Sequence, residues 1–210
     1  MIKKLSKRLS ILLSKSLDGS SEDVEIWAYG LELLLNGTIK FGLIAGLSAS
    51  FGIFKPTILT LITFAVFRCF GGGVHFSTYL RCLTFGVIKF LILGSISNMK
   101  GNMSNYSLLF FVTLFLGILT IIKWVPGDTE IKPIKDKEDR KKQKIKTTIV
   151  LIFWMIIVQI LISLNSFKYI LPIILGALTS FIFITPLGYW FITSIDNILD
   201  KTKVKYEEVK

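Results

Sequence analysis

Six long apolar blocks, separated by short polar stretches, constrain the fold of this chain more than any other feature of its sequence. The blocks run over residues 26–50, 56–70, 79–97, 106–125, 147–164 and 169–195. Inside them the apolar residues follow neither a helical nor a strand period, which is typical of helices surrounded by lipid and by one another. Because a helix of about 20 residues spans the hydrocarbon core, the last four blocks are long enough to cross a membrane.

The first two blocks are less regular than the others. The first carries Glu32, Asn36 and Lys40, and the second lies between Pro56 and a glycine triplet. Either of them could be a short or re-entrant segment embedded in protein. The sequence therefore predicts a single all-α integral membrane domain, residues 1–210, with about six membrane-embedded helices. The first two helices either span the membrane or are short or re-entrant.

Composition excludes several other classes of protein. The chain is 52% hydrophobic and only 19% charged, which is too apolar for a soluble domain of 210 residues. Two cysteines are too few for a disulfide framework. A metal site built from His75, Cys69 and Cys82 would lack a fourth ligand, so neither a metal nor another cofactor is expected. The net charge of +11 follows from membrane topology, so no nucleic-acid partner is expected.

The positions of lysine and arginine predict the orientation of the chain in the membrane. Five precede residue 20, nine lie in 123–146 and four in 201–210, whereas the loops at 98–106 and 165–168 hold one each. Basic loops stay in the cytoplasm. Both termini, the loop 126–146 and the tail 196–210 are therefore predicted to be cytoplasmic, in a multi-pass membrane protein. Counting spans back from that loop places 68–82 at the same face.

The N-terminal segment 1–20 is basic but has no cleavage site, so it is expected to be retained. Its apolar residues recur at helical spacing opposite its lysines and arginine, which favours a helix lying in the cytoplasmic interface. A frayed basic tail is the alternative.

The segment 68-RCFGGGVHFSTYLRC-82 contains the only histidine and both cysteines of the chain. A cysteine thiol, with a pKa of about 8.5, needs a base, a cation or a helix N-terminus to become a nucleophile at neutral pH. On one continuous helix His75 and Cys82 would be about 10.5 Å apart, too far for a hydrogen bond. The glycines end the preceding helix, and Ser77 or Thr78 can cap a new one, so that His75 can fold back toward Cys82.

Other readings of these residues stay open at this point. A single histidine or cysteine is often a structural residue. Arg68 could extend its charge to the interface, bind a carboxylate or stabilise an oxyanion. A third, orienting residue could be Glu32, a carboxylate in an apolar stretch, although Glu32 could equally pair with Lys40 or Arg68. Ser77 could hydrogen-bond His75 instead of capping a helix.

The order of Arg68, Gly72-Gly73, His75 and Cys82 resembles the signature of the accessory gene regulator B (AgrB) family, membrane cysteine endopeptidases of Gram-positive quorum-sensing systems. Two further stretches are similar to that family, 27-WAYGLELLLNG-37 and 125-VPGDTEIKPI-134. The resemblance implies that Cys82 is the nucleophile and His75 the general base and acid, with Arg68, Gly72 and Gly73 in support. It implies cleavage of an AgrD-like precursor peptide, loss of its acidic C-terminal tail, and cyclisation of the acyl-enzyme to a thiolactone or lactone.

The same resemblance is compatible with a homodimer. The basic loop is either a solvated loop that fixes topology or a dock for an acidic peptide or anionic lipid headgroups. Its candidate substrate contacts are Lys132, Lys135, Arg140 and Lys141. Two other functions stay open: a peptide or lipid transporter that uses the polar residues of the first helices, and a non-catalytic membrane scaffold.

Overall fold

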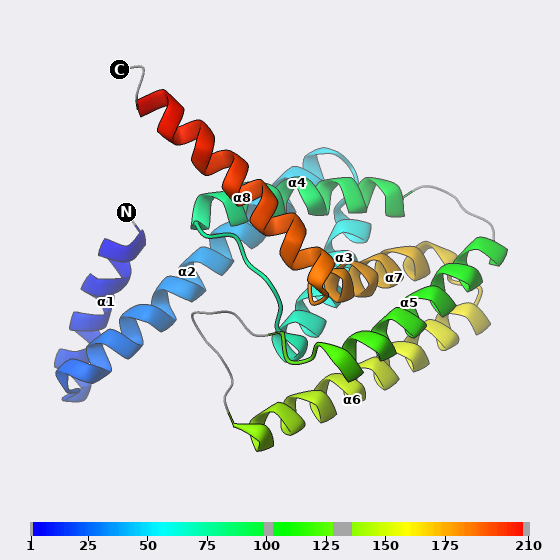
Figure 1. Cartoon of the computed structure of the whole chain (residues 1–210), viewed down its shortest axis with the longest axis horizontal. Coiled ribbons are helices and arrows are strands. Elements are labelled where there is room, and N and C mark those ends of the chain that lie inside the picture. The colour runs from blue at the N-terminus through cyan, green and yellow to red at the C-terminus, as the bar shows by residue number, and fades with distance from the viewer. Residues whose placement is uncertain (1, 99–102, 128–135, 208–210) are drawn as a thin grey trace. The chain divides into compact units, whose positions relative to one another are not determined.

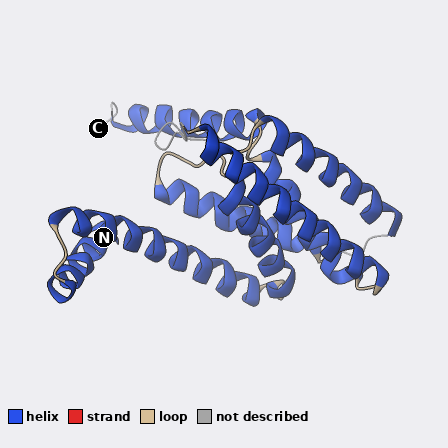
Figure 2. Ribbon diagram, turned by 90° about the horizontal axis from the view of Figure 1, so that it is seen from below, coloured by secondary structure: helices blue, strands red, loops and turns tan. Residues whose placement is uncertain are grey.

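The computed structural model describes residues 2–98, 103–127 and 136–207. These residues form eight α-helices and no strand (Figures 1 and 2). They divide into two compact units, Met1–Leu47 and Ser48–Lys210. The expected all-α class is confirmed.

The first unit contains α1 (Ile2–Leu17) and most of α2 (Ser21–Ser50). Ser20 caps α2: its hydroxyl accepts from the amide of Asp23, and the Asp23 carboxylate accepts in return from the Ser20 amide. This reciprocal capping box explains why α2 begins at residue 21. In α1 the buried residues are Ser6 and Ser10, whereas most of its leucines are exposed. An apolar surface left open in this way suits a helix in contact with lipid.

Five helices are long and apolar enough to cross a membrane: α2, α3 (Phe54–Gly71), α4 (Tyr79–Ser97), α5 (Met103–Lys123) and α6 (Lys137–Ser163). A bent pair, α7 (Phe167–Ile182) and α8 (Pro186–Glu207), can supply a sixth span. The count agrees with a multi-pass membrane protein. Neither of the first two blocks is interrupted, since α2 is one helix of 30 residues and α3 one of 18.

The second unit is organised around α7. This helix packs against α3, α4, α5 and α6, and its central position can be followed in Figure 1. Phe67, Trp154 and Phe181 form part of the buried core, with Phe67 and Phe181 at a ring separation of 4.7 Å. Gly176 allows the closest approach, because a Cβ there would lie 2.6 Å from the Thr60 carbonyl oxygen of α3.

The last apolar block, 169–195, is long enough for one span, but the structure divides it between two helices. The helix stops at Ile182 and resumes at Pro186, and the two halves are bent by 77°. Proline has no backbone N–H and cannot continue the hydrogen-bond ladder. The break leaves the carbonyl oxygen of Phe183 available to another segment of the chain, and that segment is the glycine turn described next.

Candidate active site

The turn after α3 is held in place by backbone pairing with a distant glycine. Gly72 and Gly73 have φ angles of 73° and 119°, values open to glycine but costly for other residues. The Gly73 amide donates to the Gly127 carbonyl at 2.9 Å, and the Gly127 amide donates to the Gly71 carbonyl at 2.8 Å. The stretch that follows α5 therefore braces the glycine turn, a contact that the sequence did not reveal.

The break between α7 and α8 holds the other side of the same turn. The Phe183 carbonyl accepts from the Val74 amide at 3.2 Å and from Arg68 Nη1 at 3.5 Å. Arg68 Nη2 donates to the Val74 carbonyl at 2.5 Å. Arg68 thus joins the last turn of α3 to the residues that immediately precede His75.

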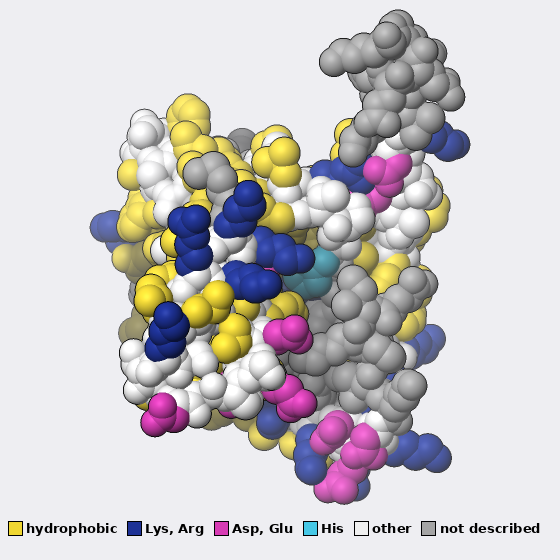
Figure 3. All heavy atoms as spheres, turned by 90° about the vertical axis from the view of Figure 1, so that its left-hand side faces the viewer, with side chains coloured by type: hydrophobic (Ala, Val, Ile, Leu, Met, Phe, Trp, Pro, Cys, Tyr) yellow, Lys and Arg dark blue, Asp and Glu magenta, His cyan; other side chains and the backbone are white. Residues whose placement is uncertain are grey.

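Arg68 also contacts one of the two predicted catalytic residues and interacts with the other. Its Nη2 lies 3.0 Å from His75 Nε2, and its guanidinium interacts electrostatically with Cys82 and Tyr189. Because a guanidinium can only donate, His75 accepts this bond at Nε2, which places the proton of the neutral ring on Nδ1. The histidine is exposed and reaches the molecular surface (Figure 3).

The second half of the segment starts a helix that positions Cys82. Thr78, rather than Ser77, is the N-cap of α4, and its hydroxyl accepts from the Arg81 amide at 3.4 Å. Cys82 is half-buried at the fourth position of the helix, in its first turn. Cys69, in contrast, is exposed near the end of α3.

Asp196 of α8 is a site residue that sequence reasoning missed. Its Oδ2 accepts from the Ser77 amide at 2.8 Å, and its Oδ1 accepts from Arg81 at 2.8 Å. Arg81 also donates to the Ser77 hydroxyl at 3.1 Å and to Asp200. The side chains of Arg81 and Asp196 are only 16% and 13% exposed, so this ion pair is shielded far better than a surface pair. It ties α8 to the loop between His75 and Cys82.

The bonds from Asp196 to the Ser77 amide and to Arg81 form a clamp on the loop before α4. Removing this clamp should make the loop more dynamic. We expect Asp196→Ala to accelerate amide hydrogen exchange of residues 75–82 by about tenfold or more, because the Ser77 amide and the Arg81 side chain lose their shared acceptor. Asp200→Ala is the matched control, since Asp200 is 61% exposed and an exposed ion pair contributes little. Exchange measured by mass spectrometry on intact protein in detergent tests this. Equal exchange in both variants would contradict a clamping role.

The other sequence candidates lie in three places. Glu32 is half-buried on α2 in the first unit, and its role as an orienting residue stays a prediction. Lys132 and Lys135 lie outside the described residues. Arg140 and Lys141 lie in the first turn of α6. Arg140 lines a cavity of about 400 Å³ together with Lys123, Gly127 and Tyr189.

The chemistry available at this site is that of a thiol, an imidazole and a guanidinium. Within residues 2–98, 103–127 and 136–207, no three histidine, cysteine or acidic side chains gather as they would around a metal ion. A half-buried thiol beside a cation and a histidine can form a thiolate and attack a carbonyl carbon. The cavity beside Gly127 could hold part of a substrate with negative charge.

Comparison with known proteins gives one consistent family. The model of the accessory gene regulator B family matches residues 3–191. An AgrB-like protein of Clostridium perfringens strain SM101 is 26% identical over 212 residues, which cover 96% of this chain and 99% of the relative. An AgrB-like protein of Listeria innocua is 28% identical over 189 residues, or 88% of this chain and 89% of the relative. No solved structure matches.

Proposed function

Because the chain belongs to the accessory gene regulator B family, and so has a role in the accessory gene regulator system, we propose that it is a membrane cysteine endopeptidase acting on an AgrD-type precursor peptide. One observation carries the proposal: Arg68 contacts His75 Nε2 at 3.0 Å and interacts with Cys82, on a turn held by Phe183 and Gly127. A thiol, a base and a fixed cation are the groups that peptide-bond cleavage by cysteine requires.

The proposed reaction starts with transfer of the Cys82 thiol proton to His75. The thiolate attacks the scissile carbonyl carbon, and the resulting oxyanion collapses as the C–N bond breaks. His75 returns its proton to the leaving amine, so the C-terminal tail departs with a free N-terminus and the peptide stays on Cys82 as a thioester. A cysteine or serine of the peptide then attacks the thioester carbonyl. The product is a thiolactone or lactone ring, and Cys82 regains its proton.

Arg68 has two tasks in this mechanism. Its positive charge interacts with Cys82, so it lies close to the sulfur that carries negative charge during the attack. Its bond to His75 Nε2 occupies the lone pair that must receive the thiol proton, so the guanidinium has to release His75 before cleavage. A carbonyl or carboxylate of the bound precursor would be a stronger acceptor for Arg68 than the imidazole. Substrate binding would then free the base at the moment when it is needed.

The cavity lined by Lys123 and Arg140 supports an acidic leaving segment. It adjoins Gly127, whose backbone pairs with Gly73, so it lies beside the glycine turn. Among the described residues that line it, none is acidic. An acidic peptide tail in this cavity would gain from both cations while its scissile bond is at Cys82. The same cations favour a cytoplasmic position for this end of the protein.

The proposal is tested with the wild-type protein in lipid vesicles and a synthetic cognate precursor. Mass spectrometry should detect the free tail, an acyl adduct on Cys82 and a cyclic product. Arg140→Gln should raise KM several-fold for the acidic precursor, and should have no effect on a precursor whose tail carboxylates are replaced by amides. Lys146→Gln, an exposed residue of the same helix, is the control. An intact precursor that nevertheless binds would overturn the endopeptidase and favour a transporter or scaffold.

A further inference from the structure

A second and larger cavity lies at the other end of the helices that build the active site. It has a volume of about 870 Å³ and is lined by the first turns of α3 and α7, the end of α4, and Tyr106 of α5. The glycine turn follows the last residue of α3, whereas this cavity borders its first. An 18-residue helix rises about 27 Å, close to the thickness of the hydrocarbon core, so the two sites lie near opposite membrane faces.

Two helix N-termini open into this cavity. The first three residues of α3 (54–56) and of α7 (167–169) all line it. Neither N-cap residue, Ile53 or Ser166, provides a side-chain hydrogen bond to its helix. The first amides of a helix have no partner within the helix, and its N-terminal end carries a partial positive charge. The C-terminal ends of α2, at Ala49, and of α4, at Ser97 and Asn98, line the same cavity, so the helix dipoles offset one another and the net positive charge has to come from side chains.

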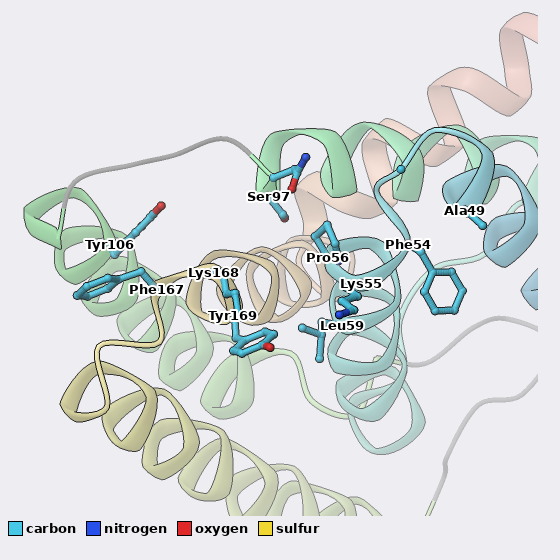
Figure 4. A pocket seen from close by; sticks show the side chains of 12 residues that line it. Ala49, Phe54, Lys55, Pro56, Leu59, Ser97, Tyr106, Phe167, Lys168 and Tyr169 are labelled. Atoms are coloured by element: carbon cyan, nitrogen blue, oxygen red, sulfur yellow. The ribbon is translucent and has the colours of Figure 1, made fainter.

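Lysine side chains add full positive charge at the same place. Lys55 of α3 and Lys168 of α7 are both exposed and lie on facing sides of the cavity, with Tyr169 beside them (Figure 4). The lining contains no aspartate or glutamate. Among the described residues, no carboxylate forms an ion pair with either lysine. The cavity therefore has cationic groups without protein counter-ions.

A buried hydroxyl in the wall of the cavity gives independent evidence for a ligand. Ser97 of α4 is 5% exposed, and its Oγ has no hydrogen-bond partner. It lines the same cavity, opposite the α3–α7 side (Figure 4). A buried polar group without a hydrogen-bond partner carries a free-energy cost. A ligand oxygen that reaches this hydroxyl would remove that cost.

We propose that this cavity binds the headgroup of an anionic phospholipid. Its phosphate accepts from Lys55 and Lys168, and a headgroup or glycerol oxygen reaches Ser97. The ligand is a lipid rather than a free anion because Phe54, Leu59 and Phe167 line the same cavity and can contact the glycerol ester and the start of an acyl chain. A phosphatidylcholine is a poorer ligand, since its quaternary ammonium would meet two lysines.

The test measures lipid binding without any peptide substrate, so its result is independent of the proposed endopeptidase activity. Full-length protein in a non-ionic detergent is titrated with short-chain phosphatidylglycerol, with phosphatidylcholine of the same chains, and with glycerol phosphate, and bound lipid is counted by native mass spectrometry. We expect one saturable phosphatidylglycerol site, with Kd raised about tenfold or more in Lys55→Gln/Lys168→Gln. Lys137→Gln/Lys146→Gln removes the same charge outside the cavity and should bind as wild type does.

Ser97→Ala keeps the test decisive if the double variant does not fold. It should fold at least as stably as wild type without lipid, because the orphan hydroxyl is gone, and it should bind phosphatidylglycerol several-fold more weakly. Equal affinity for the two phospholipids, or equal affinity in the double variant and its control, would overturn the proposal. Glycerol phosphate binding as tightly as the lipid would also overturn it, since the ligand would then be a soluble anion.

Discussion

Cys82→Ala is expected to abolish release of the precursor tail while leaving precursor binding intact. The variant removes only a sulfur atom, on a helix whose cap at Thr78 and whose clamp at Asp196 do not involve that sulfur. Without a nucleophile, no thioester can form, so the rate should fall by about three orders of magnitude or more. Mass spectrometry of the precursor, together with a binding titration of the same sample, measures both properties.

The chain offers a matched control in its other cysteine. Cys69→Ala removes an exposed thiol from the last turn of α3 and should retain wild-type cleavage. Tail release by Cys82→Ala would refute the nucleophile assignment.

Several helices could be predicted from the sequence because they are apolar blocks of the right length. The blocks at 56–70 and 79–97 match α3 and α4 to within two residues, whereas α6 begins at Lys137, ten residues before its block and inside the predicted basic loop. The break before Pro186 was missed, because the block 169–195 contains two prolines and the first, Pro172, lies inside α7 without ending it. The consequence is functional, since the break supplies the Phe183 carbonyl to Val74 and Arg68.

The site could be predicted only as far as it is local in sequence. Glycines, a cap and the His75–Cys82 spacing all lie within 15 residues, and they were sufficient to place a turn and a new helix. The groups that hold the turn come from Gly127, Phe183 and Asp196. Gly127 and Phe183 act through backbone groups. Every residue has such groups, so the side-chain types in the sequence do not reveal these contacts. Asp196 had a signal in the sequence, an acidic residue at the end of an apolar block, but its partner Arg81 is 115 residues away.

Gly73→Ala is expected to cause the second large loss of cleavage. It leaves the nucleophile in place and acts by displacing Arg68. A Cβ at residue 73 would lie 2.8 Å from the Phe183 carbonyl oxygen and would overlap Arg68 Nη1, and the φ of 119° is itself strained for alanine. The variant must therefore move Arg68 or open the turn. Either change separates the cation from His75 and Cys82, so cleavage should fall at least about a hundredfold, with a stability loss of about 1–3 kcal/mol.

The comparison that isolates this effect is Gly42→Ala, in the middle of α2. No atom lies within 4 Å of a Cβ built at Gly42, and alanine favours a helix by up to about 1 kcal/mol, so that variant should keep full cleavage and unfold at the same or a higher temperature. Cleavage and thermal unfolding are measured on both proteins in the same detergent. If Gly73→Ala cleaves like Gly42→Ala, the glycine turn does not hold the catalytic groups, and the conformation of residues 71–74 has to be explained by folding alone.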